Sequence, residues 1–295
     1  MSLVPSRFLD CVVALGVGPE PGSDAITPGW IASGFFYGRR VGTDADGIPQ
    51  YYVYLVSNRH VFDGLDSIIV RANPPADNPD PARDYPVALN DDTGQPLWLA
   101  HPRESVDVAV IKVDYNRLQS EGMQLSFFTD DELSMTGEQM KAAGTTEGDY
   151  VYVLGYPMGL VGEQRAVVIV RNGSIARIRD ALAGTEDSYL VDSSVFPGNS
   201  GGPVVIRPKA MALHGTTAPQ KARLIGIVTG YVSYSEVAVS AQTGRVRMLF
   251  EENSGLASAH LVDSINECID PDPRFHQTRM QFAAPPPEGG PQEAT

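Results

Sequence analysis

Residues 197–203 read Pro-Gly-Asn-Ser-Gly-Gly-Pro, and the β-branched runs Tyr189–Val191 and Val204–Ile206 flank them. Glycine allows a sharp turn that exposes the Ser200 hydroxyl. The same turn directs the N–H groups of Gly198 and Ser200 toward one point, where they could stabilise a developing oxyanion. Pro197 has no N–H and cannot be a donor. The pattern therefore indicates a nucleophilic serine. A glycine-rich turn between strands that has no catalytic role is also consistent with this sequence.

Working outward from this motif, short runs rich in Val, Ile, Tyr and Phe alternate with Gly, Pro, Asn and Asp. Such runs are typical of β-strands separated by turns. Helical signals are scarce, namely a segment from Thr129 to about Ala143 and another from His260 to Cys268. The sequence therefore predicts an all-β fold with a short C-terminal helix. We expect strands at residues 8–15, 31–37, 51–57, 67–71, 106–113, 150–154, 166–170, 189–191, 204–206 and 224–229.

The composition excludes several classes of protein. The chain has 295 residues and a formal net charge of −14, which disfavours binding to nucleic acid phosphates. The sequence contains no apolar run of 18 or more residues, so it predicts no membrane span. Cys11 and Cys268 are too few for a metal cluster and allow at most one disulfide. The few cysteines and the lack of a convincing signal peptide favour the cytoplasm of a bacterium.

Two further segments supply what a nucleophilic serine needs, a base and an acid that orients the base. Ser57-Asn58-Arg59-His60-Val61-Phe62 follows one strand, and Val106-Asp107-Val108-Ala109-Val110-Ile111-Lys112-Val113 begins another. Together with the serine motif, these segments resemble the three catalytic signatures of trypsin-like serine proteases. The Pro-Gly-Asn-Ser-Gly-Gly-Pro form is similar to that of the bacterial HtrA-like branch. The order His, Asp, Ser and the intervals of 107 − 60 = 47 and 200 − 107 = 93 residues also resemble that fold.

The resemblance implies two antiparallel β-barrels, with His60 and Asp107 on the first and Ser200 on the second. It implies a serine endopeptidase in which Ser200 attacks the carbonyl, His60 transfers protons and Asp107 orients the imidazole. The Gly198 and Ser200 amides would form the oxyanion hole. Substrate would be a protein or peptide that pairs with the strand Thr229-Gly230-Tyr231. This mechanism requires no metal and no organic cofactor, and we expect neither.

The sequence also departs from the family. Asn199 stands where zymogen-activated trypsins have an aspartate, and a neutral amide cannot pair with a new N-terminus. Ser194 would lie near the bottom of the specificity pocket. Because serine carries no charge, the pocket would not favour Arg or Lys in the substrate. Gly255, within Asn253-Ser254-Gly255-Leu256, would form the second wall, and Tyr231 would narrow the entrance. We therefore expect a small or medium apolar residue at P1.

The predicted domain organisation is one protease domain over residues 1–269, with a first barrel at about 1–125 and a second at about 145–262. Residues 270–295 are rich in Pro and Gly and predict a flexible tail. The HtrA-like branch usually carries a C-terminal PDZ domain, and we expect none in this chain. Residues 72–104 and 114–148 align poorly and would offer surfaces for a regulatory protein partner.

Other histidines could compete with His60, but none follows a strand in the same way. We expect His101 to be a solvated loop residue, His214 to lie in a polar loop, His260 to begin a helix and His276 to lie in the tail. Two alternatives to a constitutive protease stay open. The chain could be a non-catalytic trypsin-like binding module, or a latent protease that a partner activates.

Overall fold

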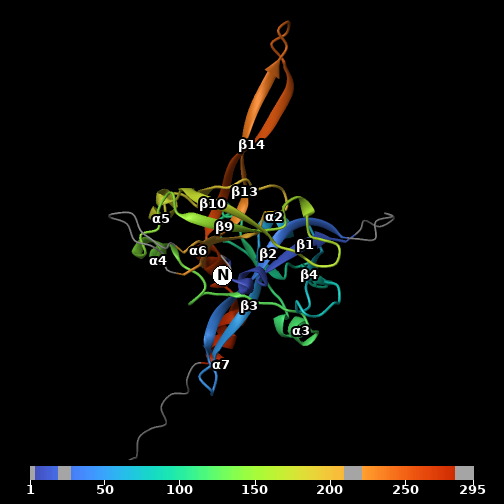
Figure 1. Cartoon of the computed structure of the whole chain (residues 1–295), viewed down its shortest axis with the longest axis vertical. Helices are drawn as coiled ribbons and strands as arrows, with labels where there is room; N and C mark the ends of the chain where they lie inside the picture. The colour runs from blue at the N-terminus through green and yellow to red at the C-terminus, as the bar shows by residue number, and fades with distance from the viewer. Residues whose placement is uncertain (1–3, 19–27, 209–220, 283–295) are drawn as a thin grey trace, which may run out of the picture.

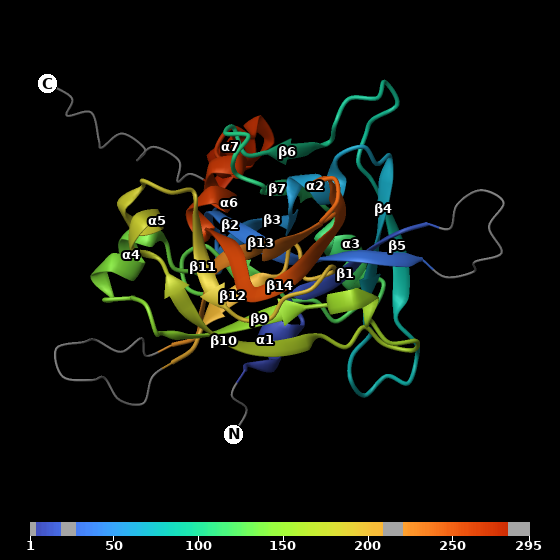
Figure 2. The same cartoon turned by 90° about the horizontal axis from the view of Figure 1, so that it is seen from above.

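The structure is a computed structural model that describes residues 4–18, 28–208 and 221–282. Two β-rich halves pack against each other, and the C-terminal helical segment contacts strands of both halves (Figures 1 and 2). The first half contains β1 (Val12–Val17), β2 (Gly29–Thr43), β3 (Pro49–Ser57), β4 (Ser67–Ala72), β5 (Arg83–Ala88), β6 (Trp98–Ala100), β7 (Ala109–Lys112) and β8 (Phe128–Thr129). The second half contains β9 (Tyr150–Gly155), β10 (Ile169–Arg177), β11 (Ser188–Asp192), β12 (Pro203–Ile206), β13 (Arg223–Val239) and β14 (Val246–Leu261).

The strand pairing confirms the predicted fold class. The second half is a closed barrel in the order β10-β11-β14-β13-β12-β9. The first half is an eight-stranded sheet in the order β5-β4-β1-β2-β3-β7-β6, with β8 added parallel to β2. This half-barrel sheet and the closed barrel correspond to the two barrels expected from the sequence.

Helices are short and lie mostly between strands. They are α1 (Ser6–Leu9), α2 (Arg59–Phe62), α3 (Tyr115–Ser120), α4 (Gly137–Ala142), the 3₁₀ turn η1 (Pro157–Gly159), α5 (Arg179–Ala183), α6 (Val262–Ile269) and α7 (Pro273–Phe282). The helix expected over Thr129–Ala143 forms only as α4, where Thr136 and Gln139 make a capping box. No helix of the described residues is long and apolar enough to cross a membrane.

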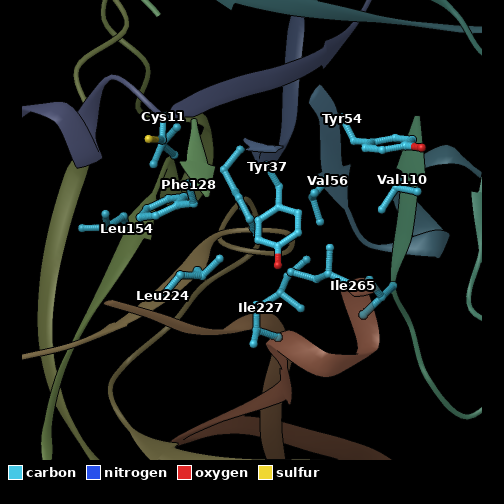
Figure 3. Packing of buried hydrophobic residues seen from close by; sticks show 14 of the residues in the cluster. Cys11, Tyr37, Tyr54, Val56, Val110, Phe128, Leu154, Leu224, Ile227 and Ile265 are labelled. Atoms are coloured by element: carbon cyan, nitrogen blue, oxygen red, sulfur yellow. The ribbon is translucent and has the colours of Figure 1, made fainter. Parts of the chain in front are cut away.

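One apolar core lies between the two halves and joins them. It combines residues of β2 and β3 with residues of β9, β13 and α6, among them Tyr37, Leu154, Ile227 and Ile265 (Figure 3). Burying such side chains contributes about 1.5–3 kcal/mol each. The Tyr37 hydroxyl donates to Asn266 Oδ1 at 2.9 Å, which ties α6 to the first half. This shared core fixes how the two halves meet, and the site lies at that junction.

The flexible tail predicted from residue 270 is wrong for its first part. Residues 273–282 form α7, and Phe275 is 1% exposed and stacks edge-on against Tyr52. Just before the helix, Asp272 is fully buried and accepts a hydrogen bond from the Tyr54 hydroxyl at 2.8 Å. An aromatic anchor and a satisfied buried carboxylate order this segment despite its polar composition. The rest of the predicted tail, residues 283–295, lies outside the described residues.

Candidate active site

Strand pairing brings His60 and Asp107 together. His60 lies in α2, which begins two residues after β3 ends, and Asp107 lies two residues before β7 begins. β3 and β7 are antiparallel neighbours that place Ser57 opposite Ala109. Chain segments 47 residues apart in sequence therefore meet at one sheet edge. This is the arrangement that the two sequence signatures predicted.

The contact between His60 and Asp107 is bidentate. The His60 backbone N–H donates to Asp107 Oδ1 at 3.0 Å, and His60 Nδ1 lies 2.6 Å from Asp107 Oδ2. Asn58 Nδ2 donates to the Asp107 carbonyl at 2.6 Å and holds the loop from the other side. With its Nδ1 proton held by the carboxylate, the neutral imidazole has its free acceptor at Nε2. The His60 side chain is 52% exposed, so this ring is open to an incoming molecule.

A second histidine supports the acid from behind. Asp107 donates its backbone N–H to His260 Nε2 at 3.1 Å, and His260 Nδ1 donates to the Asp187 carbonyl at 2.7 Å. His260 is 4% exposed, and burial lowers its pKa below the ordinary value, so the ring is held neutral in one tautomer. The expectation that His260 begins a helix is wrong, because His260 belongs to β14. Its assignment to a helix start hid its role.

The expectation that His101 is solvated is also wrong. Its side chain is buried, with Nε2 lying 2.6 Å from Glu267 Oε2 of α6. Arg59, the neighbour of His60, donates to the His101 carbonyl at 2.6 Å. His101 is therefore a structural residue behind the His60 helix. His276 lies in α7, and His214 lies outside the described residues.

The loop that carries Ser200 is anchored to the first half through Ser33 of β2. Ser33 is fully buried, and its hydroxyl donates to the Gly198 carbonyl at 2.6 Å. The Ser33 N–H donates to the Ser200 carbonyl at 2.9 Å, and the Ser57 hydroxyl donates to the Ser33 carbonyl at 2.9 Å. One serine of the first half therefore positions the backbone on both sides of Asn199. A polar residue within the apolar run Ile31–Tyr37 was the only signal for it in the sequence.

Glycine is required twice in this loop. Gly198 has φ +97° and Gly201 has φ +81°, a region that other L-residues rarely adopt. A Cβ at Gly198 would lie 2.4 Å from the Tyr156 carbonyl oxygen, and one at Gly201 would lie 2.2 Å from the Ser33 carbonyl oxygen. In the described part of the chain, the N–H groups of Gly198 and Ser200 donate to no other group. They are available as the two donors of an oxyanion hole.

The Ser200 hydroxyl itself is engaged elsewhere. Its Oγ donates to the Thr229 carbonyl at 3.2 Å, and within the described residues it makes no hydrogen bond to His60. The serine and the histidine thus lie at one junction, but the described residues show no hydrogen bond between them. In structures without substrate such catalytic bonds are often long and form only in the complex.

Asn199 occupies a buried position below the loop. It is 1% exposed, and its Oδ1 accepts from the Phe196 N–H at 3.0 Å. Its Nδ2 is buried without a hydrogen-bond partner among the described groups. The side chain therefore stabilises the turn from within the loop.

The residues expected to form the specificity pocket lie on two segments that hydrogen bonds join. Ser194 is exposed, and the loop around it is joined to the Gly255 loop because Ser193 N–H donates to the Gly255 carbonyl at 3.1 Å. Asn253 Nδ2 also donates to the Val195 carbonyl at 2.6 Å. The two expected pocket walls are therefore connected.

The strand expected to bind substrate lies next to these walls. Thr229 and Gly230 are half-buried on β13, just beyond the part of β13 that pairs with β12. Tyr231 is 40% exposed. The structure places all three at the edge where Ser200 lies.

Comparison with known proteins identifies the family. Residues 32–211, more than half of the chain, match the family model described as a trypsin-like peptidase domain. The chain therefore belongs to the trypsin-like peptidase family. No curated protein gives a significant match.

Three solved structures are similar at low sequence identity. The HtrA-type protease AlgW with a decapeptide has 20% identity, a TM-score of 0.45 and coverage of 94% of this chain and 66% of that one. The MamO protease domain from Magnetospirillum magneticum has 15% identity, a TM-score of 0.46 and coverage of 89% and 97%. The inactive form of the Rv3671c protease has 16% identity, a TM-score of 0.41 and coverage of 90% and 90%. This chain thus spans just under two thirds of the AlgW chain.

Proposed function

We propose that this protein is a serine endopeptidase that hydrolyses peptide bonds through an acyl-enzyme intermediate. The observation that carries the proposal is the bidentate contact of His60 with Asp107, 2.6 Å at Nδ1, at the same junction as Ser200. That contact leaves Nε2 as the acceptor that a nucleophilic serine requires. The unused N–H groups of Gly198 and Ser200 supply the electrostatic component.

In the proposed reaction, the Ser200 hydroxyl leaves the Thr229 carbonyl and donates to His60 Nε2. Ser200 Oγ attacks the scissile carbonyl carbon as His60 takes the proton, and the oxyanion binds the Gly198 and Ser200 N–H groups. His60 then gives the proton to the leaving amine, and water hydrolyses the acyl ester by the same route. Asp107 stabilises the imidazolium throughout and keeps its own charge.

The substrate we propose is a protein or peptide in extended conformation, bound along Thr229-Gly230-Tyr231. We assign Ser194 and Gly255 to two walls of the P1 pocket, and the hydrogen bond from the Ser193 N–H to the Gly255 carbonyl supports this assignment. Ser194 has no charge to pair with an Arg or Lys of the substrate. This supports a small or medium apolar residue at P1.

A latent form of the same protease is the second candidate, and the hydrogen bond from Ser200 to Thr229 favours it. In this form the serine stays on the Thr229 carbonyl until a peptide or regulatory protein displaces it. A latent protease would react slowly alone and faster with that partner present.

A fluorophosphonate probe, which labels activated serines, tests both forms. We expect labelling of the folded protein, none of Ser200→Ala and at least about a hundredfold slower labelling of His60→Ala. Ser67→Ala is the matched control, because it removes an exposed serine of β4 in the first half and should label normally. Labelling that appears only after addition of an unfolded protein substrate would indicate the latent form. A folded protein that stays unlabelled in both conditions would contradict the proposal.

A further inference from the structure

The hairpin formed by β13 and β14 continues far beyond the barrel. β13 pairs with β12 only as far as Ile227, and β14 pairs with β11 only from Leu256 onward. The two strands nevertheless stay paired with each other out to Val239 and Val246. We call residues 234–252 the outer ribbon. In Figure 1 it is the orange hairpin that stands away from the body, and both of its edges are free of other described strands.

The outer ribbon exposes large apolar side chains that no described element covers. Seven of its large side chains are about half exposed or more, namely Tyr234, Val237, Val239, Val246, Met248, Leu249 and Phe250. A two-stranded ribbon without a packed face is marginally stable in water, and a free apolar edge readily pairs with another strand. Contiguous exposed apolar surface of this kind indicates an interaction site. The question is which partner its chemistry fits.

The exposed edge of β14 is complementary to itself. Residues 247–251 read Arg-Met-Leu-Phe-Glu. When two copies of this strand pair antiparallel about Leu249, Arg247 lies opposite Glu251 and Met248 opposite Phe250, each twice by symmetry. Opposite charges and sulfur–aromatic pairs are both favourable across strands. The segment therefore matches a second copy of itself in charge and in side-chain type.

Neighbouring registers do not share this match. Directly opposite residues must point to the same face of the sheet, so the register can change only in steps of two. A shift of two residues places Leu249 opposite Arg247 or opposite Glu251, and the only arginine it can bring opposite Glu251 is Arg245, which lies before β14 begins at Val246. The free edge of β13 offers no alternative, because Glu236 is its single charged residue in the outer ribbon. Charge complementarity therefore selects both the β14 edge and one register.

The backbone of β14 is irregular at one end of this pairing. Ala238 pairs with Met248 and Val239 with Val246, so Arg247 is the extra residue of a β-bulge. No β13 residue lies opposite Arg247, and its long side chain is free to reach a carboxylate of another molecule. Glu251 lies opposite Ser235, which has no charge to compete for it.

We propose that two copies of this chain associate through their β14 edges, forming a four-stranded antiparallel sheet with two-fold symmetry about Leu249. The interface is isologous, as is usual for homodimers. Paired edges of this length bury less area than a stable obligate dimer, so the association is reversible and depends on concentration. The proposal does not depend on proteolytic activity.

Sedimentation velocity tests the proposal on Ser200→Ala protein, in which self-cleavage cannot interfere. Between about 1 and about 200 μM, we expect a monomer–dimer equilibrium. Arg247→Glu and Glu251→Arg each replace two attractive pairs with two repulsive ones and should weaken the dimer by at least about tenfold. The double variant Arg247→Glu/Glu251→Arg restores both pairs and should restore the dimer. Glu236→Arg on the opposite edge is the matched control and should leave association unchanged.

Three outcomes would overturn the proposal. One is a monomer throughout the concentration range, which would leave the ribbon to a different protein or to a polypeptide substrate. Another is a dimer that neither single reversal weakens, or that the double variant fails to restore. The last is an oligomer larger than two. Circular dichroism of each variant verifies that it is folded, and the exposed positions lie outside the core, so none is expected to unfold the protein.

Discussion

The loop that carries Ser200 and the outer ribbon differ sharply in how tightly they are packed. A Cβ added to Gly198, Gly201 or Gly202 would lie within 2.4 Å of a backbone oxygen of Tyr156, Ser33 or Leu154. A Cβ added to Gly230 or Gly244, on the hairpin of β13 and β14, would meet nothing within 4 Å. The same barrel strand, β13, contacts the serine loop at its base and stands free at its outer end.

The difference in packing matches the two roles proposed for these regions, catalysis and association. The proposed acyl transfer requires donors and nucleophile fixed to a fraction of an ångström, and both halves of the molecule hold the backbone of the serine loop. An association surface requires exposure, and the outer ribbon has it because no described element covers it. Segments with few packed contacts are also the ones whose sequence can change without unfolding the protein.

Substituting Gly201 should give the largest effect on stability. Gly201→Ala introduces a Cβ 2.2 Å from both the Ser33 carbonyl oxygen and Ser57 Oγ, at φ +81°. We expect a loss of at least about 3 kcal/mol in the free energy of unfolding, measured by urea denaturation. Labelling of Ser200 by the fluorophosphonate should fall with it, because the Ser33–Ser200 hydrogen bond shifts.

Gly184→Ala is the matched control for that variant. Gly184 has a similar φ of +76° after α5, but its Cβ would meet nothing within 4 Å. It should lose only about 1 kcal/mol, the cost of the backbone conformation alone. Equal losses in the two variants would show that close packing of the serine loop contributes nothing, and the comparison would fail.

The serine loop, His60 and Asp107 could be predicted because each carries a local signature that geometry imposes. The glycines of the serine motif, a histidine after a strand and an aspartate before a strand can all be recognised in the amino-acid sequence. Ser33 and His260 could not be predicted, since their roles come from strands that meet only in the folded chain. The outer ribbon was missed for a related reason. The strand beginning at Leu224 was expected to end at Thr229, because polar residues such as Ser233 and Ser235 interrupt its apolar pattern.

Substituting His260 tests whether the part of β14 inside the barrel supports the candidate active site. Burial lowers its pKa, so the unfolded chain binds a proton below about pH 6.5 before the folded protein does. The stability contributed by neutral His260 is therefore present above about pH 6.5 and is lost as the pH falls toward the lowered pKa. In urea denaturation, wild-type protein should lose stability from pH 7.5 to pH 5.5, and His260→Gln should lose less.

At pH 7.5 the same variant should be less stable by about 1–2 kcal/mol, since the Asp107 N–H loses its acceptor. Slower fluorophosphonate labelling at unchanged folding would show that His260 positions Asp107. His276→Gln, at an exposed histidine of α7, is the control and should retain the wild-type pH dependence. Parallel pH profiles for wild type and His260→Gln would rule out the assigned role.

The smallest effect on stability should come from Gly230→Ala, at the point where β13 leaves the barrel. The added Cβ meets no atom within 4 Å, so the free energy of unfolding should change by no more than about 0.5 kcal/mol. If Gly230 borders the path of the substrate backbone, the methyl group obstructs a peptide but not a small probe. We therefore expect unchanged fluorophosphonate labelling and a kcat/KM for peptide cleavage that is at least about tenfold lower. Gly244→Ala, at the far end of the hairpin, should leave both unchanged. A loss of more than about 2 kcal/mol in Gly230→Ala would instead mean that tight packing extends beyond the serine loop into the hairpin.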